Sequence, residues 1–211
     1  MEDVLDVYAR PYSAREPVVC FDEKPVPLHE DARAPKPPRP GHVAQRDYEY
    51  VRKGSANLFY SVEPLAGRHR VEATQDRTAA RTARALKHVA DAYPEARTVH
   101  LVWDNLNTHC EKTLTDTFGQ QKGHALWGRF TVHYTPKHGS WLDQAEVGLS
   151  ILSRQCLGTR RIATLPMLQR ETAAWRRGVN RQHLRFSWRF TSRKARATFH
   201  YSRRDMLRSK D

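Results

Sequence analysis

The sequence predicts an α/β fold with a mixed sheet, because strand-like and helix-like segments alternate along most of its 211 residues. Short apolar runs that end in polar residues are typical of buried strands, and apolar residues three or four positions apart are typical of helices. The expected order is strand, hairpin, helix, strand, helix, strand, helix. With 39% hydrophobic residues, a chain of this length can bury one full core and carry an extension.

The pattern begins with strands. Residues 17–24 resemble a short buried strand that ends in acidic residues. Residues 25–41 contain six prolines, so we expect a loop or an edge excursion there rather than a helix or an inner strand. Residues 57–63 and 69–74 alternate between polar and apolar and are separated by a turn at 66–67, which predicts a hairpin.

Helix and strand then alternate. We expect a helix that is N-capped by Asp76 and closed by Pro94, followed by a buried strand over residues 98–103. Thr108 and Glu111 form a capping-box pattern that predicts the start of the next helix.

The last predicted strand covers residues 130–135 and is followed by a turn over 136–139. Ser140 and Asp143 form a second capping-box pattern, which predicts a helix with a stripe of apolar residues. Pro166 favours the first turn of a further helix.

The net charge of +13 lies in one part of the chain. Residues 1–150 contain 20 basic and 20 acidic residues, whereas residues 151–211 contain 16 basic and 3 acidic ones. A stretch this basic attracts a polyanion, of which nucleic acid is the commonest. Aromatic residues interleave with the arginines and favour a packed, DNA-facing module over a solubilising tail, namely Trp175, Phe186, Trp188, Phe190 and Phe199.

Several other classes are disfavoured. No apolar run approaches the roughly 20 residues that span a bilayer, and the N-terminus has no apolar signal segment. Cys20, Cys110 and Cys156 are far apart and lack the paired spacing of a zinc site, so we expect idle or buried thiols in a reducing cytoplasm.

Acidic residues follow two of the predicted buried strands. Asp22 comes directly after VVCF and Asp104 directly after VHLVW. If these strands are neighbours, both carboxylates emerge at the same end of the sheet, where open α/β sheets build their sites. The alternative is that these acids form surface ion pairs with Lys24 or Lys137.

The helix after Gly139 offers Asp143 or Glu146 as a third acid. Asp143 would be occupied as the capping-box partner of Ser140, whereas Glu146 borders the buried stripe and can lean towards the sheet. We therefore prefer Glu146. Three carboxylates without Cys or His favour Mg²⁺ or Mn²⁺, and two such ions can drive phosphodiester chemistry.

Longer strings carry a family resemblance. VVCFDEK, VWDNLNTH and HYTPKHGSWLDQAEVGLSILSRQC resemble, in order and spacing, the three catalytic blocks of bacterial insertion-sequence transposases of the mariner-related branch of the DDE superfamily. DYEYVRKGSANLFYSVEPLAG and FSWRFTSRKAR are similar to the same branch. The resemblance implies a ribonuclease-H-like fold, in which helices flank a five-stranded mixed sheet whose first and fourth strands are adjacent.

The resemblance also implies residue roles. The catalytic and metal-binding acids fall on Asp22, Asp104 and Glu146, with two Mg²⁺ or Mn²⁺ ions expected. Supporting roles fall on Asn105, His109 and Lys137, although for His109 a plain position at a helix start is an equal alternative. The expected DNA contacts are Lys24, Lys137, Trp141, Arg154, Arg160 and Arg161. For Trp141, core packing is favoured over base stacking.

These inferences predict an organisation and a function. We expect a lead-in over residues 1–16, a catalytic core over 17–160 and a basic helical extension over 161–211. The expected activity is cleavage and transfer of double-stranded DNA at transposon ends and TA-containing targets, by a homodimer in the bacterial cytoplasm at the nucleoid, without a membrane.

Three alternatives stay open. A helix-turn-helix reader does not fit before residue 17, so we expect a truncated chain, a remnant or one half of a split transposase whose other half reads the DNA. A non-catalytic DNA-binding regulator is a second interpretation of the same sequence. A ribonuclease H or junction resolvase is a third.

Overall fold

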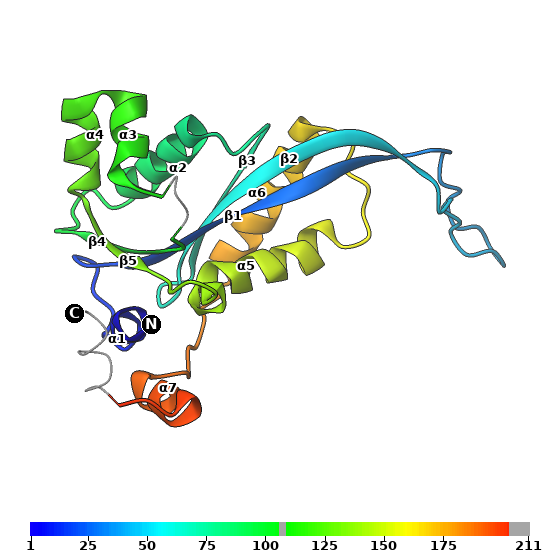
Figure 1. The fold of residues 1–211 in the computed structure, drawn as a ribbon. Coiled ribbons are helices and arrows are strands. Elements are labelled where there is room, and N and C mark those ends of the chain that lie inside the picture. The colour runs from blue at the N-terminus through cyan, green and yellow to red at the C-terminus, as the bar shows by residue number, and fades with distance from the viewer. Residues whose placement is uncertain (106–108, 203–211) are drawn as a thin grey trace.

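The structure, a computed structural model, describes residues 1–105 and 109–202 and contains a five-stranded mixed sheet in the order β3-β2-β1-β4-β5 (Figure 1). The strands β1 to β3 form antiparallel pairs, and β1 with β4 and β4 with β5 form parallel pairs. Their bounds are Val18–Asp31 for β1, Tyr50–Glu63 for β2, Arg68–Thr74 for β3, Val99–Trp103 for β4 and Phe130–Tyr134 for β5. The expected mixed sheet, with its first and fourth strands adjacent, is confirmed.

Helices cover both faces of this sheet (Figure 1). Side chains alternate along β1, so Cys20 joins one core with residues of α1, α5 and α6, while Phe21 joins a second core with residues of α2 and α3. The helices are α1 (Glu2–Tyr8), α2 (Ala79–Asp91), α3 (Glu111–Phe118), α4 (Gln120–Trp127), α5 (Gln144–Leu152), α6 (Leu165–Arg181) and α7 (Ser192–Phe199). No helix within the described ranges is long and apolar enough to cross a membrane.

The proline-rich segment was predicted wrongly in its first part. Strand β1 continues to Asp31, and Pro25 and Pro27 lie opposite Asn57 and Ser55 of β2. The prolines are tolerated because β4 pairs with β1 only as far as Cys20 and the next backbone bond on that side comes from His29, so a missing N–H at Pro25 or Pro27 removes no ladder bond.

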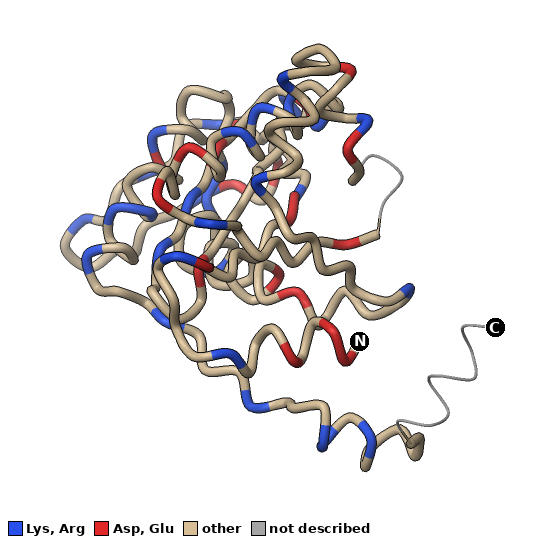
Figure 2. Tube along the Cα trace, turned by 90° about the vertical axis from the view of Figure 1, so that its left-hand side faces the viewer, with Lys and Arg blue, Asp and Glu red and all other residues tan. Residues whose placement is uncertain are grey.

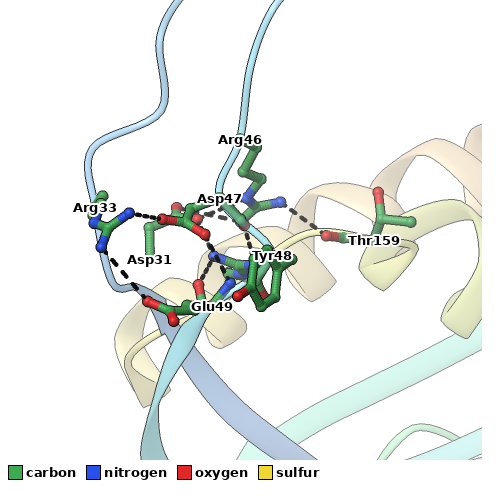
Figure 3. A network of polar contacts seen from close by, with 8 residues as sticks. Asp31, Arg33, Arg46, Asp47, Tyr48, Glu49 and Thr159 are labelled. Atoms are coloured by element: carbon green, nitrogen blue, oxygen red, sulfur yellow. Dashed lines mark hydrogen bonds and ion pairs between the residues drawn. The ribbon is translucent and has the colours of Figure 1, made fainter.

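The antiparallel pair of β1 and β2, which we call the β1–β2 arm, ends where Asp31 lies opposite Tyr50. This end is hydrogen bonded to the chain that follows α5 (Figure 3). The Asp31 carboxylate receives hydrogen bonds from Arg46 and Arg161, each at 2.7 Å. Arg46 also donates to the carbonyl oxygen of Thr159, and Arg161 donates to that of Tyr48. This network fixes the direction in which the arm leaves the body.

Two helix starts differ from the sequence expectation. Helix α2 has Thr78 at its N-cap, and Asp76 instead accepts a hydrogen bond from the Thr78 backbone N–H at 3.1 Å. Helix α3 has Cys110 at its N-cap, and Thr108 lies outside the described residues. A short polar residue near a helix start can close a local turn as well as a cap, and the sequence pattern does not separate the two.

The basic C-terminal part packs on the same core as the strands up to the end of the described range. Trp175, Phe186 and Trp188 lie against the core that contains Tyr60, while residues 172–202 contain no Asp or Glu. The C-terminal trace in Figure 2 is accordingly marked with basic residues alone up to the undescribed segment. The expectation of a packed module is therefore confirmed, and the boundary at residue 161 stays a prediction.

Candidate active site

Asp22 and Asp104 emerge at the same level of the sheet. The parallel ladder between β1 and β4 pairs Cys20 with Val102, and each Asp lies two residues beyond its member of that pair. Because the two strands are neighbours and run in the same direction, both carboxyl groups leave the same sheet edge. The structure thus brings together the two acids that the sequence placed at strand ends.

Helix α5 brings the third acid to this edge. Its stripe is buried as predicted, from Ala145 through Leu149 to Leu152, and Glu146 lies at the border between buried and exposed positions. The helix can lie directly on β2 because residue 148 is glycine: a Cβ there would lie 2.0 Å from the Tyr60 hydroxyl oxygen. The close approach of α5 therefore positions Glu146.

The expected capping role of Asp143 is wrong in detail. Ser140 starts a short 3-10 helix, Ser140–Leu142, and Asp143 is itself the N-cap of α5. Its Oδ1 accepts a hydrogen bond from the Ala145 backbone N–H at 2.8 Å, which satisfies one of the free donors of the first turn. Asp143 therefore has a structural role, as the sequence argument for Glu146 requires.

The acids affect one another electrostatically. Burial raises the pKa of Asp22, and the charges of Glu23, Asp104 and Glu146 add to this effect, while the Glu23 backbone N–H that donates to Asp22 at 2.7 Å lowers it. Together these effects bring the pKa of Asp22 to about 7. Burial also raises the pKa of Asp143, to which the charges of the other acids add. Neither Lys24 nor Lys137 forms an ion pair with Asp22, Asp104 or Glu146 within the described residues.

His109 lies between two acids. Its ring is 1% exposed, stacks on Trp103 at 3.9 Å between centroids, and forms an ion pair with Asp104 through Nδ1. Its Nε2 lies 3.3 Å from Glu23 Oε1. Burial lowers the pKa of this imidazole, but the hydrogen bonds to Asp104 and Glu23 outweigh burial and raise the pKa to about 9. His109 is therefore charged at neutral pH and holds the Asp104 carboxylate.

Glu23 is a site residue that the sequence reasoning did not single out. Its side chain points to the opposite face of β1 from Asp22, is largely buried, and leaves Oε2 without a hydrogen-bond partner among the described residues. The sequence did contain a signal for Glu23. Alternation along the strand turns its side chain towards a buried face, and a buried carboxylate needs a cationic partner.

The other predicted residues are more scattered. Lys24 lies two positions after Asp22 and so on the same face of β1, whereas Asn105 and Lys137 are exposed. Trp141 is 44% exposed with its ring against Phe190, so the expectation of core packing is wrong. The ring follows a tight turn and lies outside the apolar stripe of α5.

The three predicted DNA-binding arginines have intramolecular partners. Arg154 donates to the Ser150 hydroxyl at 2.7 Å, Arg160 pairs with Glu171, and Arg161 pairs with Asp31 of β1. Their role on DNA stays a prediction.

The chemistry of the donors fits a hard divalent cation. The three acids offer only oxygen ligands, and the mutual repulsion that raises the Asp22 pKa is what a cation would relieve. Over residues 1–105 and 109–202, no three His, Cys, Asp or Glu side chains already lie close enough to hold a metal ion. The acids therefore converge on one edge without forming a preassembled cage.

A mixed five-stranded sheet with one acid within its first strand, another after the adjacent fourth strand, and a third on the helix after its fifth defines a ribonuclease-H-like fold. The family described as DDE superfamily endonuclease matches residues 17–169, and the chain belongs to that family. This confirms the family-level resemblance of the sequence, whereas an origin in a bacterial insertion sequence stays a prediction. No curated protein sequence matches the chain.

Solved structures of the Mos1 mariner transposase have the same fold. The paired-end complex with Mn matches with a TM-score of 0.53 and 17% identity, over 86% of this chain and 55% of that one. The strand transfer complex matches with 0.54 and 19%, over 85% and 55%. The paired-end complex with the left transposon end matches with 0.55 and 17%, over 86% and 55%. This chain thus spans about half the length of those chains.

Proposed function

We propose that this chain is the catalytic domain of a DNA transposase, which cuts and joins DNA strands with Asp22, Asp104 and Glu146 as metal ligands. The proposal rests on one observation. The Cys20–Val102 register leaves Asp22 and Asp104 side by side at one sheet edge, and the charge of Glu146 reaches Asp22 there. Membership of the DDE superfamily endonuclease family supports the proposal.

The expected ions are two Mg²⁺ or Mn²⁺. Bound to the three acids, they would activate the attacking water or 3′-hydroxyl and stabilise the leaving oxygen of a phosphodiester. Asp22 must give up its proton to serve as a ligand, because its pKa is about 7 without a cation. His109, held between Glu23 and Asp104, fixes the orientation of the Asp104 carboxylate.

The proposed partner is double-stranded DNA, with transposon ends and TA-containing targets as substrates. A homodimer on DNA, and a separate helix-turn-helix half that reads the ends, belong to the same proposal. The Mos1 structures are complexes with transposon ends, which supports DNA as the partner class of this fold. The proposed setting is the nucleoid of a bacterium that carries the element.

The decisive experiment is metal-dependent nicking of supercoiled plasmid DNA. We expect nicking with Mg²⁺ or Mn²⁺, none in EDTA, and at least a thousandfold loss in Asp104→Ala and in Glu146→Gln. Asp116→Asn is the matched control, because Asp116 is an exposed acid of α3 that pairs with Lys112. Undiminished cleavage in both site variants would contradict the proposal.

A second function has one observation in its favour. The acids form no ready cation cage within the described residues, which suits a non-catalytic DNA-binding protein that regulates a full-length transposase. Such a protein would bind DNA with an affinity that falls steeply with salt, and would give no metal-dependent product. The nicking assay therefore separates the two functions.

A further inference from the structure

The strongest feature outside the acidic site is a cavity of about 630 Å³ at the edge strand β3. It lies among the strands β2 and β3 and the helices α2 and α6. Five arginines line it, and we name it the arginine cavity: Arg68, Arg70, Arg176, Arg177 and Arg181. None of Asp22, Asp104 and Glu146 lines it.

The cavity lies around the edge strand β3, away from the strands β1 and β4 that carry Asp22 and Asp104. Arg70 lies opposite Ser61 and Arg68 opposite Glu63 in the ladder between β3 and β2. Ser61 in turn pairs with Phe21, whose side chain faces α2, whereas the neighbouring Asp22 faces α5. The wall formed by α6 lies on the same face of the sheet as α5, but none of the three acids lines the cavity, so the cavity is separate from the acidic site.

Most of the positive charge in the arginine cavity is uncompensated. Arg68 lies 3.8 Å from the Glu63 carboxylate, which is 2% exposed and also accepts a hydrogen bond from the Tyr93 hydroxyl. The other four arginines form no salt bridge with the described residues. Elsewhere in the basic part of the chain the pattern is mixed: Arg160, Arg161 and Arg196 each pair with an acid, whereas Arg189 and Arg193 also lack an acidic partner among the described residues.

The arginines are held on a rigid frame. Asn180 of α6 docks on the edge strand: its Oδ1 accepts the His69 backbone N–H at 2.7 Å, and its Nδ2 donates to the His69 carbonyl at 2.9 Å. The His69 ring is buried and hydrogen bonded to Tyr60 and to the Leu184 carbonyl. This docking covers the open edge of β3 and fixes α6 relative to it.

Guanidinium groups on a fixed frame suit phosphate. Arginine presents a planar fork that binds two phosphate oxygens at once, and little entropy is lost when its backbone is already fixed. Arg68, Arg70, Arg177 and Arg181 are exposed and come from two elements, so the charge forms an open rim. An extended polyanion can contact several members of such a rim at once, which a single small anion cannot.

We propose that the arginine cavity binds the phosphate backbone of duplex DNA, at a surface separate from the acidic site. This inference rests on the proposed function only in taking DNA as the polyanion. Binding at the cavity requires neither a metal ion nor Asp22, Asp104 or Glu146.

The test is duplex binding in EDTA, measured by fluorescence anisotropy of labelled DNA over a series of salt concentrations. For Arg177→Gln combined with Arg181→Gln we expect at least tenfold weaker binding. The slope of log affinity against log salt should fall by about 2, since each lost phosphate contact removes about 0.9. Arg52→Gln combined with Arg84→Gln removes the same charge from exposed positions outside both the cavity and the basic C-terminal part, and should change both values little.

A separate variant guards against loss of folding. Arg70→Gln alters β3 rather than α6, and we expect its slope to fall by about 1. Circular dichroism must show native folding for every variant that is compared. Equal loss in the cavity pair and the control pair would mean that net charge alone binds DNA and would overturn the proposal, as would wild-type binding by the folded cavity variants. Failure of the nicking assay would leave this binding result unaffected.

Discussion

The two sides of the acidic site hold their carboxylates in different ways. On the strand side, the backbone ladder between β1 and β4 sets the level of Asp22 and Asp104. The negative charge of these acids is poorly compensated, because one imidazolium, that of His109, serves both Asp104 and Glu23. Burial and the neighbouring acids accordingly raise the pKa of Asp22 to about 7.

On the helix side, side-chain packing sets the position of Glu146. Asp143 caps α5, the Tyr8 hydroxyl donates to the Leu142 carbonyl at 2.8 Å just before it, and Gly148 admits the Tyr60 ring. The strand side should therefore respond mainly to changes of charge, and the helix side mainly to changes of volume and capping.

The largest expected effect is on the charge of the strand side. The folded protein binds the Asp22 proton with a pKa of about 7, against an ordinary value of 3.8, so this group makes the fold less stable as pH rises from 4 to 7. Asp22→Asn removes that loss. In EDTA above pH 7 we expect the variant to be more stable than wild type by about 1–4 kcal/mol.

Urea unfolding of both proteins between pH 4 and pH 8 measures this difference. Near pH 4 the two should be about equally stable, and Mg²⁺ should stabilise the wild type alone at pH 7.5. If the stability difference between wild type and Asp22→Asn does not grow with pH, the ionised Asp22 carboxylate does not destabilise the fold.

The second effect concerns the support of Asp104. His109→Ala removes both the stacking on Trp103 and the cation between Asp104 and Glu23, so we expect nicking to fall about 100-fold, roughly 3 kcal/mol. His124→Ala is the matched control, because His124 is exposed and also pairs with an acid, Glu111. Equal nicking rates in the two variants would show that His109 has no supporting role in the chemistry and is only a residue at a helix start.

The third effect tests packing on the helix side. A methyl group at residue 148 would meet the Tyr60 hydroxyl, so Gly148→Ala should destabilise the fold by about 1–3 kcal/mol and move Glu146 away from the strands. Gly178→Ala in α6 is the control, since nothing lies within 4 Å of the added carbon, and it should stabilise by about 0.5–1 kcal/mol. Thermal unfolding measures both, and stabilisation by both would show that α5 does not rest on Tyr60.

The sequence predicts the strand side better than the helix side, for a physical reason. An apolar run followed by an acid is a local pattern, so the amino-acid sequence alone singles out Asp22 and Asp104. Asp104 does follow β4, whereas Asp22 lies inside β1, two residues beyond the point where β1 stops pairing with β4. The register between β1 and β4 is a non-local property, and the adjacency of these strands follows only from the family resemblance.

The missed features depend on partners distant in the chain. Glu23 became a site residue only because the fold brings His109 to it, 86 positions away in the sequence. The same holds for the arginine cavity, whose arginines come from β3 and α6. In the sequence they are only hairpin residues or members of a basic segment, and nothing there indicates that they meet. Strand β1 was predicted too short because its free edge beyond Cys20, which tolerates proline, is not visible in the sequence.

The smallest expected effect decides between the two acids at the start of α5. Asn is about as good an N-cap as Asp, so near pH 4 Asp143→Asn should keep the stability of the fold within about 0.5 kcal/mol, whereas Asp143→Ala should lose about 1 kcal/mol. Because burial raises the pKa of Asp143, the Asn variant should gain stability over wild type as pH rises. If Glu146 is the ligand, Asp143→Asn keeps the metal-dependent nicking that Glu146→Gln loses. A folded Asp143→Asn protein without nicking would instead make the buried Asp143 part of the chemistry, since its Oδ2 has no hydrogen-bond partner among the described residues. Capping by Asp143 would then not exclude metal binding, because one oxygen of its carboxylate can cap the helix while the other remains available to a cation.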